Sequence, residues 1–118
     1  HLIIDCAPAE LPTVLTVLAL VGQAMCVRSD QLDTVIIVIG DKHLRGPRSD
    51  RVRAGIAHYW LEAVYVARGP NWPLVLAHEL LHLLCGANRK EQDVKRLERA
   101  LARPLQLRLG ERGCKVAP

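Results

Sequence analysis

Residues 74–85 read LVLAHELLHLLC, and the rest of the chain can be arranged around this segment. Every residue in it is apolar except His78, Glu79 and His82. A proline just before the segment and a glycine directly after it suit the two ends of a helix. The segment therefore predicts a helix that lies in the interior of a domain and carries one narrow polar stripe.

The three polar residues form the pattern HExxH, whose spacing suits a metal site. His78 and His82 are four residues apart, so on a helix both imidazoles project from one side and can reach one ion. Glu79 lies about 100° round the helix, where it can exchange protons with a metal-bound water without being a ligand. We therefore predict His78 and His82 as ligands of Zn²⁺ and Glu79 as the catalytic general base, with a self-satisfied His/Glu hydrogen-bond network as the alternative. His43 and His58 are expected to be surface or packed histidines.

A catalytic zinc needs a third protein ligand and one open position. The candidates lie on a second predicted helix, Asn88 to Arg103, which we expect Pro104 to end; LQLRL after it would be a last strand or tail. The apolar stripe of this helix comprises Val94, Leu97 and Leu101. Glu91 and Asp93 flank the stripe on opposite sides, so periodicity leaves both open as the third ligand.

The chain before the motif predicts a helix followed by strands. The apolar segment from Pro8 to Val27 reads as a core helix, and the β-branched run from Asp33 to Ile39 as a buried central strand. Two further strands are expected, from Val52 to Trp60 and from Ala63 to Arg68. The order helix, strands, helix, helix is typical of an α+β domain, and 118 residues can bury one core but hardly two.

Charge is concentrated at the C-terminal end of this chain of net charge +4. Residues 89–118 carry nine Lys or Arg against four Asp or Glu. Such a region is either a solvated helix face with a polar tail or a surface for an anionic partner such as nucleic acid. Aromatic residues make up only 3% of the chain, so a base-stacking platform is poorly supplied.

The cysteines and the hydropathy of the chain bear on disulfide bonds, membrane insertion and cellular location. The four cysteines are widely spaced with no CxxC pair, which favours free thiols over a disulfide framework. Pro12 and Gln23 interrupt the apolar segment near the start, so we expect no membrane span. The chain begins at His1 instead of Met, and we read its start as trimmed; the lack of a signal peptide favours a cytoplasmic location.

The segment Glu91 to Pro104, EQDVKRLERALARP, resembles the ExEAxxFAxxLLxP helix that follows HExxH in metallopeptidases of the ImmA/IrrE type. The resemblance covers about the last third of the chain and a general match of strand order before the motif. It implies a zincin-like fold, a zinc peptidase activity and Glu91 as the third zinc ligand. Eight residues separate His82 from Glu91, a shorter gap than is usual in that family, so Asp93 stays open.

The same region is also similar to the active-site segment of YbeY-like endoribonucleases. HELLHLLCGAN followed by VKRLERAL matches HGxLHLLGxDH followed by a helix rich in Leu and Glu. Glu79 stands where those enzymes rarely have Glu, and Asn88 stands where their third histidine would be. This resemblance implies a metal-dependent ribonuclease, for which the basic C-terminal region would attract the substrate.

We therefore expect an α+β, zincin-like single domain over residues 1–118, with a small mixed sheet, an N-terminal core helix, an active-site helix and a C-terminal helix. The strand from Ala63 to Arg68 is expected at a sheet edge beside the active-site helix, where an extended peptide could add as a further strand. The predicted function is a zinc-dependent metallopeptidase acting on peptides or proteins. The alternatives are a metal-dependent endoribonuclease and a non-catalytic zincin-fold binding or regulatory module.

Overall fold

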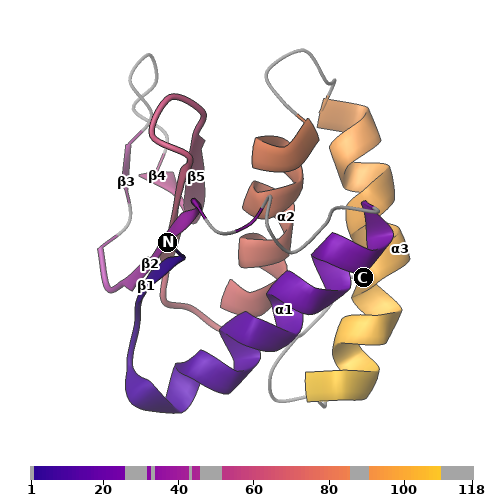
Figure 1. Ribbon diagram of the computed structural model, residues 1–118, viewed down its shortest axis with the longest axis horizontal. Coiled ribbons are helices and arrows are strands. Elements are labelled where there is room, and N and C mark those ends of the chain that lie inside the picture. The colour runs from indigo at the N-terminus through magenta and orange to yellow at the C-terminus, as the bar shows by residue number, and fades with distance from the viewer. Residues whose placement is uncertain are drawn as a thin grey trace.

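The computed structural model of the protein describes residues 2–25, 32, 34–42, 44–45, 52–85 and 91–109. These residues form three α-helices, one short 3₁₀ helix and six strands (Figure 1). In chain order the elements are β1 (Ile3–Asp5), η1 (Pro8–Glu10), α1 (Leu11–Ala24), β2 (Ile36–Gly40), β3 (Leu44–Arg45), β4 (Val52–Arg53), β5 (Gly55–His58), β6 (Ala63–Ala67), α2 (Trp72–Cys85) and α3 (Glu91–Leu109).

Four of the strands form a mixed sheet in the order β1-β2-β6-β5. β1, β2 and β6 are parallel, whereas β5 is antiparallel to β6. β2 is paired on both sides and buries Ile37 and Ile39, as expected for a central strand. β3 and β4 pair separately in a two-stranded ladder. The predicted α+β class, with a small mixed sheet and three helices, is confirmed.

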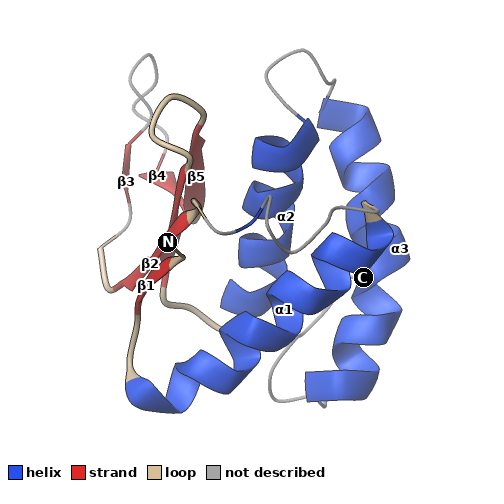
Figure 2. Cartoon of the chain, in the orientation of Figure 1, coloured by secondary structure: helices blue, strands red, loops and turns tan. Residues whose placement is uncertain are grey.

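The helices lie together on one side of the sheet (Figure 2). α2 contacts β5 and β6 of the sheet and also contacts α1 and α3, so it lies between the sheet and the other helices. Leu76, Ala77, Leu80 and Leu81 of α2 are each 0% exposed. These four residues form one face of the helix, and burying that face fixes the rotation of α2 about its axis.

The predicted core helix near the N-terminus is confirmed as α1, preceded by the 3₁₀ turn η1. Glu10, in η1, is tied to Arg68 just after β6. Nε and Nη2 of Arg68 donate to the two carboxylate oxygens of Glu10, each at 2.9 Å. Hydrogen bonding to the Arg68 guanidinium holds the pKa of Glu10 below its usual value. This pair joins the start of the first helix to the end of the central strands.

α3 continues through Pro104, so the predicted helix end there, and the predicted strand or tail after it, are wrong. Proline inside a helix removes one backbone hydrogen bond and costs about 3 kcal/mol. Leu105 follows it and is 0% exposed in the hydrophobic core. Burying a leucine contributes about 1.5–3 kcal/mol, which offsets most of the cost of the proline.

The sheet edge beside α2 is β5, and the prediction that the Ala63–Arg68 segment forms this edge is wrong. β6 pairs with β2 on one side and with β5 on the other, so it is an interior strand. β5 and β6 are joined by a tight turn in which Glu62 has a φ of 49°. In this hairpin β6 pairs with β2, so β5 is left at the edge of the sheet. The predicted strand from Val52 to Trp60 is divided between β4 and β5.

β5 and α2 approach each other closely at Gly55. A Cβ atom on Gly55 would lie 2.7 Å from Cγ1 of Val75 and 2.9 Å from Cγ of Glu79. Both distances are shorter than carbon atoms tolerate, since optimal contacts are about 3.5–4.0 Å. Gly55 is therefore the residue that allows the edge strand to lie against the side of α2 that carries Glu79.

None of the described helices is long and apolar enough to cross a membrane. Cys6 is a free thiol, as expected, and burial raises its pKa. Cys26, Cys114 and the side chain of Cys85 lie outside the described residues.

Gly55→Ala should destabilise the protein by about 1–3 kcal/mol, because the added methyl group overpacks the contact between β5 and α2. Gly69→Ala is the matched control: the nearest atom to a Cβ there is the Ala67 carbonyl oxygen at 4.0 Å, so no loss of stability is expected. Urea unfolding followed by circular dichroism measures both. Equal stability of the Gly55→Ala variant and the wild type would contradict the close packing of β5 on α2.

Candidate metal centre

His78 and His82 face each other on α2. Their Nε2 atoms are 3.1 Å apart, and their ring centroids are 4.7 Å apart with the planes at 73°. Both residues are partly buried, because they lie at the margin of the helix face that Leu80 and Leu81 bury in the core. The i, i+4 spacing thus brings the two Nε2 atoms together, as the sequence predicts.

The other nitrogen of His78 contacts α3. Nδ1 of His78 lies 2.8 Å from Oε2 of Glu98, and the two side chains are 18% and 22% exposed. An ionised carboxylate can only accept, so Nδ1 carries the proton and donates to Glu98. In neutral His78 this leaves the lone pair of Nε2 directed at His82.

The two Nε2 atoms fit a shared zinc ion. Zn–N bonds of about 2.0–2.1 Å at the tetrahedral angle separate two ligand nitrogens by roughly 3.3–3.4 Å. The observed 3.1 Å differs from this separation by a few tenths of an ångström. Without a metal, His82 can occupy the same geometry by donating its Nε2–H to Nε2 of His78.

Glu79 is directed to a different neighbour. Its Cγ atom is the one that lies 2.9 Å from the position a Cβ of Gly55 would occupy, so its side-chain stem runs along the backbone of β5. One residue along the helix is a rotation of about 100°. α2 therefore presents His78 towards α3 and the stem of Glu79 towards the edge strand.

The third predicted ligand lies at the limit of what the structure describes. Glu91 is the first residue of α3. Its backbone is described, but its side chain is outside the described residues. Asp93 is partly buried. Among the residues described, no group of three His, Cys, Asp or Glu side chains is arranged to hold a metal. Glu98 contacts Nδ1 of His78, on the opposite side of the ring from His82.

His58 has the surface position expected for it, and the two tyrosines lie outside the predicted metal ligand set. His58 is exposed at the end of β5, and His43 lies outside the described residues. The Tyr65 hydroxyl donates to the backbone carbonyl of Lys42 at 2.6 Å. Tyr59 is 38% exposed at the start of the turn between β5 and β6.

The outer face of α3 is basic. Four cations of α3 are exposed among the side chains that the structure describes, and we call them the basic stripe: Lys95, Arg96, Arg99 and Arg103. Three of them recur at i, i+4 and i+8, so the stripe follows the helix axis on the side opposite the buried Val94 and Leu101. Part of the predicted basic C-terminal region therefore lies on one side of α3, and residues 110–118 lie outside the described residues.

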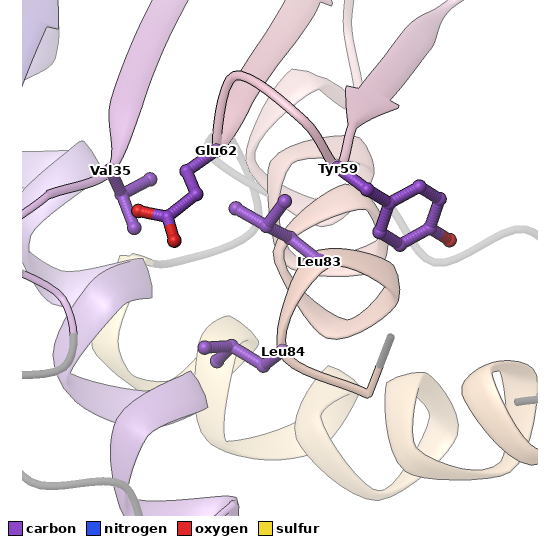
Figure 3. Close-up of a pocket in the computed structure, with 5 residues that line it drawn as sticks. All are labelled: Val35, Tyr59, Glu62, Leu83 and Leu84. Atoms are coloured by element: carbon purple, nitrogen blue, oxygen red, sulfur yellow. The ribbon is translucent and has the colours of Figure 1, made fainter. Parts of the chain in front are cut away.

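A small pocket lies beyond the histidines, towards the end of α2 (Figure 3). It has a volume of about 130 Å³ and is lined by Val35, Tyr59, Glu62, Leu83 and Leu84. Pockets for whole small ligands are roughly 300–1,000 Å³, so this one suits a single side chain. His78, Glu79 and His82 are not part of its wall.

The sequence prediction missed two residues of this region, Glu98 and Gly55. Glu98 follows Val94 by four residues, so a carboxylate interrupts the apolar stripe of α3 at a position that faces α2. This signal was present in the sequence. Gly55 has no such signal, because its role depends on a contact between segments far apart in the chain.

Comparison with protein-family models, with curated proteins and with solved structures finds no match to this chain.

Proposed function

We propose that this protein is a zinc-dependent metallopeptidase of the zincin type, with His78 and His82 as ligands and Glu79 as the general base. One observation carries the proposal: the Nε2 atoms of His78 and His82 converge at 3.1 Å on a helix whose other face is buried. HExxH is a spacing that zinc sites use, with the glutamate beside the first ligand. The same spacing also permits a hydrogen bond between the two imidazoles, and the zinc content of the protein separates the two readings.

In the proposed hydrolysis, the histidines and Glu79 have different roles. Zinc, when bound, supplies a Lewis acid that acidifies water and polarises a carbonyl group. His78 and His82 hold the ion through Nε2. Glu79 takes a proton from the attacking water and passes it to the amine that leaves. The stem of Glu79 is fixed against β5, which limits where its carboxylate can move.

The edge strand favours an extended peptide as substrate. No described strand pairs with the outer edge of β5, and the proposal is that a peptide adds to the sheet at this edge through its backbone groups. Such a peptide would pass Glu79 at the level of Gly55 and continue towards Tyr59, where the small pocket can accept one side chain.

Helix geometry supports Glu91 over Asp93 as the third ligand. α2 and α3 run antiparallel side by side (Figure 1). Glu91 precedes Glu98 by seven residues, so the two positions differ by only about 20° round α3, whereas Asp93 differs from Glu98 by about 140°. Glu91 therefore shares the helix face that meets His78.

The distance along the helices is also suitable. From the contact between His78 and Glu98, His82 lies about 6 Å along α2, and Glu91 lies about 10 Å along α3 in the same direction. The difference of about 4 Å is within the length of a glutamate side chain. We therefore propose Glu91 as the third zinc ligand.

The basic stripe favours a second candidate, a metal-dependent ribonuclease. Lys95, Arg96, Arg99 and Arg103 form a row of cations on the helix that packs beside the candidate metal centre. Phosphate groups bind such rows, with an affinity that falls steeply as salt rises. In this case the same metal and Glu79 would act on a phosphodiester.

Glu79→Gln should retain zinc and lose nearly all hydrolysis, because glutamine preserves the shape of the side chain but cannot take a proton. His78→Ala and His82→Ala should lose the metal. Zinc content is measured by elemental analysis, and hydrolysis with a mixed peptide library and a structured RNA in parallel. Asp5→Asn, at an exposed position on β1, is the control for loss of one carboxylate.

Peptide cleavage that disappears in Glu79→Gln supports the peptidase. RNA cleavage with the same dependence, and with a steep decline in salt, would assign the activity to the second candidate. Zinc binding without either cleavage would make the protein a binding module. Wild-type turnover in Glu79→Gln would remove the general-base role.

Glu91→Ala should weaken zinc binding by more than about 100-fold, since losing a ligand exceeds the 10–100-fold effect of losing an outer-shell partner. Asp93→Ala should change the affinity little. Competition with a chromophoric chelator measures both variants. The reverse order of the two affinities would transfer the role to Asp93.

A further inference from the structure

We infer that Glu98 is the positioning residue of the metal centre: it fixes the tautomer and the orientation of the His78 ring and so prepares Nε2 for the ion. The inference rests on the proposed function. It concerns a residue that touches neither the ion nor the substrate and acts only through His78.

The contact itself is short and partly shielded from water. Oε2 of Glu98 is 2.8 Å from Nδ1 of His78, and neither side chain is more than 22% exposed. An imidazole can carry its proton on either nitrogen, and only Nε2 faces His82. A carboxylate at Nδ1 holds the proton there, which leaves a lone pair on Nε2. Metal-bound histidines commonly have such a partner, which also raises the basicity of the ligand.

The position of Glu98 on α3 argues against a carboxylate that only contacts water. The residue follows Val94 by four positions and precedes Leu101 by three, and those two residues are 0% and 4% exposed. It therefore lies on the side of the helix that packs against α2, where its hydrogen bond places it beside His78. A carboxylate in this position needs a partner, and His78 supplies it.

Glu98 also couples the centre to the packing of the two helices. His78 belongs to α2 and Glu98 to α3, which are neighbouring helices joined by Val94, Leu101, Leu80 and Leu81 in one core cluster. The buried residues set the distance between the helices, and that distance sets the hydrogen bond. The metal centre is thus prepared by a contact between helices and not by α2 alone.

Three variants test this role by zinc affinity and by the tautomer of His78. Glu98→Ala should weaken zinc binding about 10–100-fold. Glu98→Gln should recover most of that loss, because its amide oxygen can still accept the Nδ1 proton. Gln92→Ala, which removes an exposed polar side chain from α3, should leave the affinity unchanged. Long-range ¹H–¹⁵N spectra of the metal-free protein should show the Nδ1–H tautomer in the wild type and in Glu98→Gln, and a smaller share of it in Glu98→Ala, where only the contact with His82 still favours it.

If Glu98 only stabilised the fold, Glu98→Ala would lower the urea midpoint of unfolding and leave the tautomer of His78 unchanged. Measuring both the midpoint and the tautomer therefore separates a positioning role from a stabilising one. Equal zinc affinity of Glu98→Ala and the wild type would overturn the inference and leave the proposed function intact. Equal losses in Glu98→Gln and Glu98→Ala would also overturn it, since they would indicate that Glu98 binds the ion directly. A wild-type protein that binds no zinc would overturn the inference and the proposed function together.

Discussion

Burial of one face of α2 is the constraint on which the candidate site depends. Leu76, Ala77, Leu80 and Leu81 are fully enclosed between the sheet and the other helices. Rotating the helix would expose these side chains at a cost of about 1.5–3 kcal/mol for each leucine. The directions of the neighbouring polar residues are therefore fixed by the core. The HExxH side chains have the directions they do because the apolar residues of the same helix leave it no other orientation.

The sequence predicted the elements that periodicity determines, and it was less accurate where contacts between distant segments decide. The helix with the HExxH stripe and the central strand β2 were predicted because their apolar patterns are continuous. The helix end at Pro104 was wrong, because the local effect of proline was weighed without the burial of Leu105 in the tertiary structure. The edge strand was wrong because strand order in a hairpin sheet depends on pairing, which the composition of each strand does not encode.

The candidate site shows the same division. Spacing along one helix predicted that His78 and His82 converge, and the structure has their Nε2 atoms 3.1 Å apart. Glu98 was not predicted, although a carboxylate in an apolar stripe is a visible signal, because its partner lies on another helix. The side chain of Glu91 lies outside the described residues, so its assignment as a ligand stays a prediction.

Two surfaces beside the centre favour different substrates. The outer edge of β5 offers backbone hydrogen bonds to an extended chain, and Gly55 brings that edge to Glu79. The basic stripe lies on the outer face of α3, whereas the stem of Glu79 lies against β5. Because the proposed base projects from the side of α2 that meets β5, we place the peptidase ahead of the ribonuclease as the proposal.

The central claim is that His78 and His82 bind one zinc ion through Nε2. X-ray absorption at the zinc edge of protein loaded with one equivalent of zinc tests it most directly. We expect two imidazole nitrogens at about 2.0–2.1 Å together with oxygen ligands, and loss of this signal in His82→Ala. Failure of the wild type to retain zinc, or a shell dominated by sulfur at about 2.3 Å, would contradict the claim.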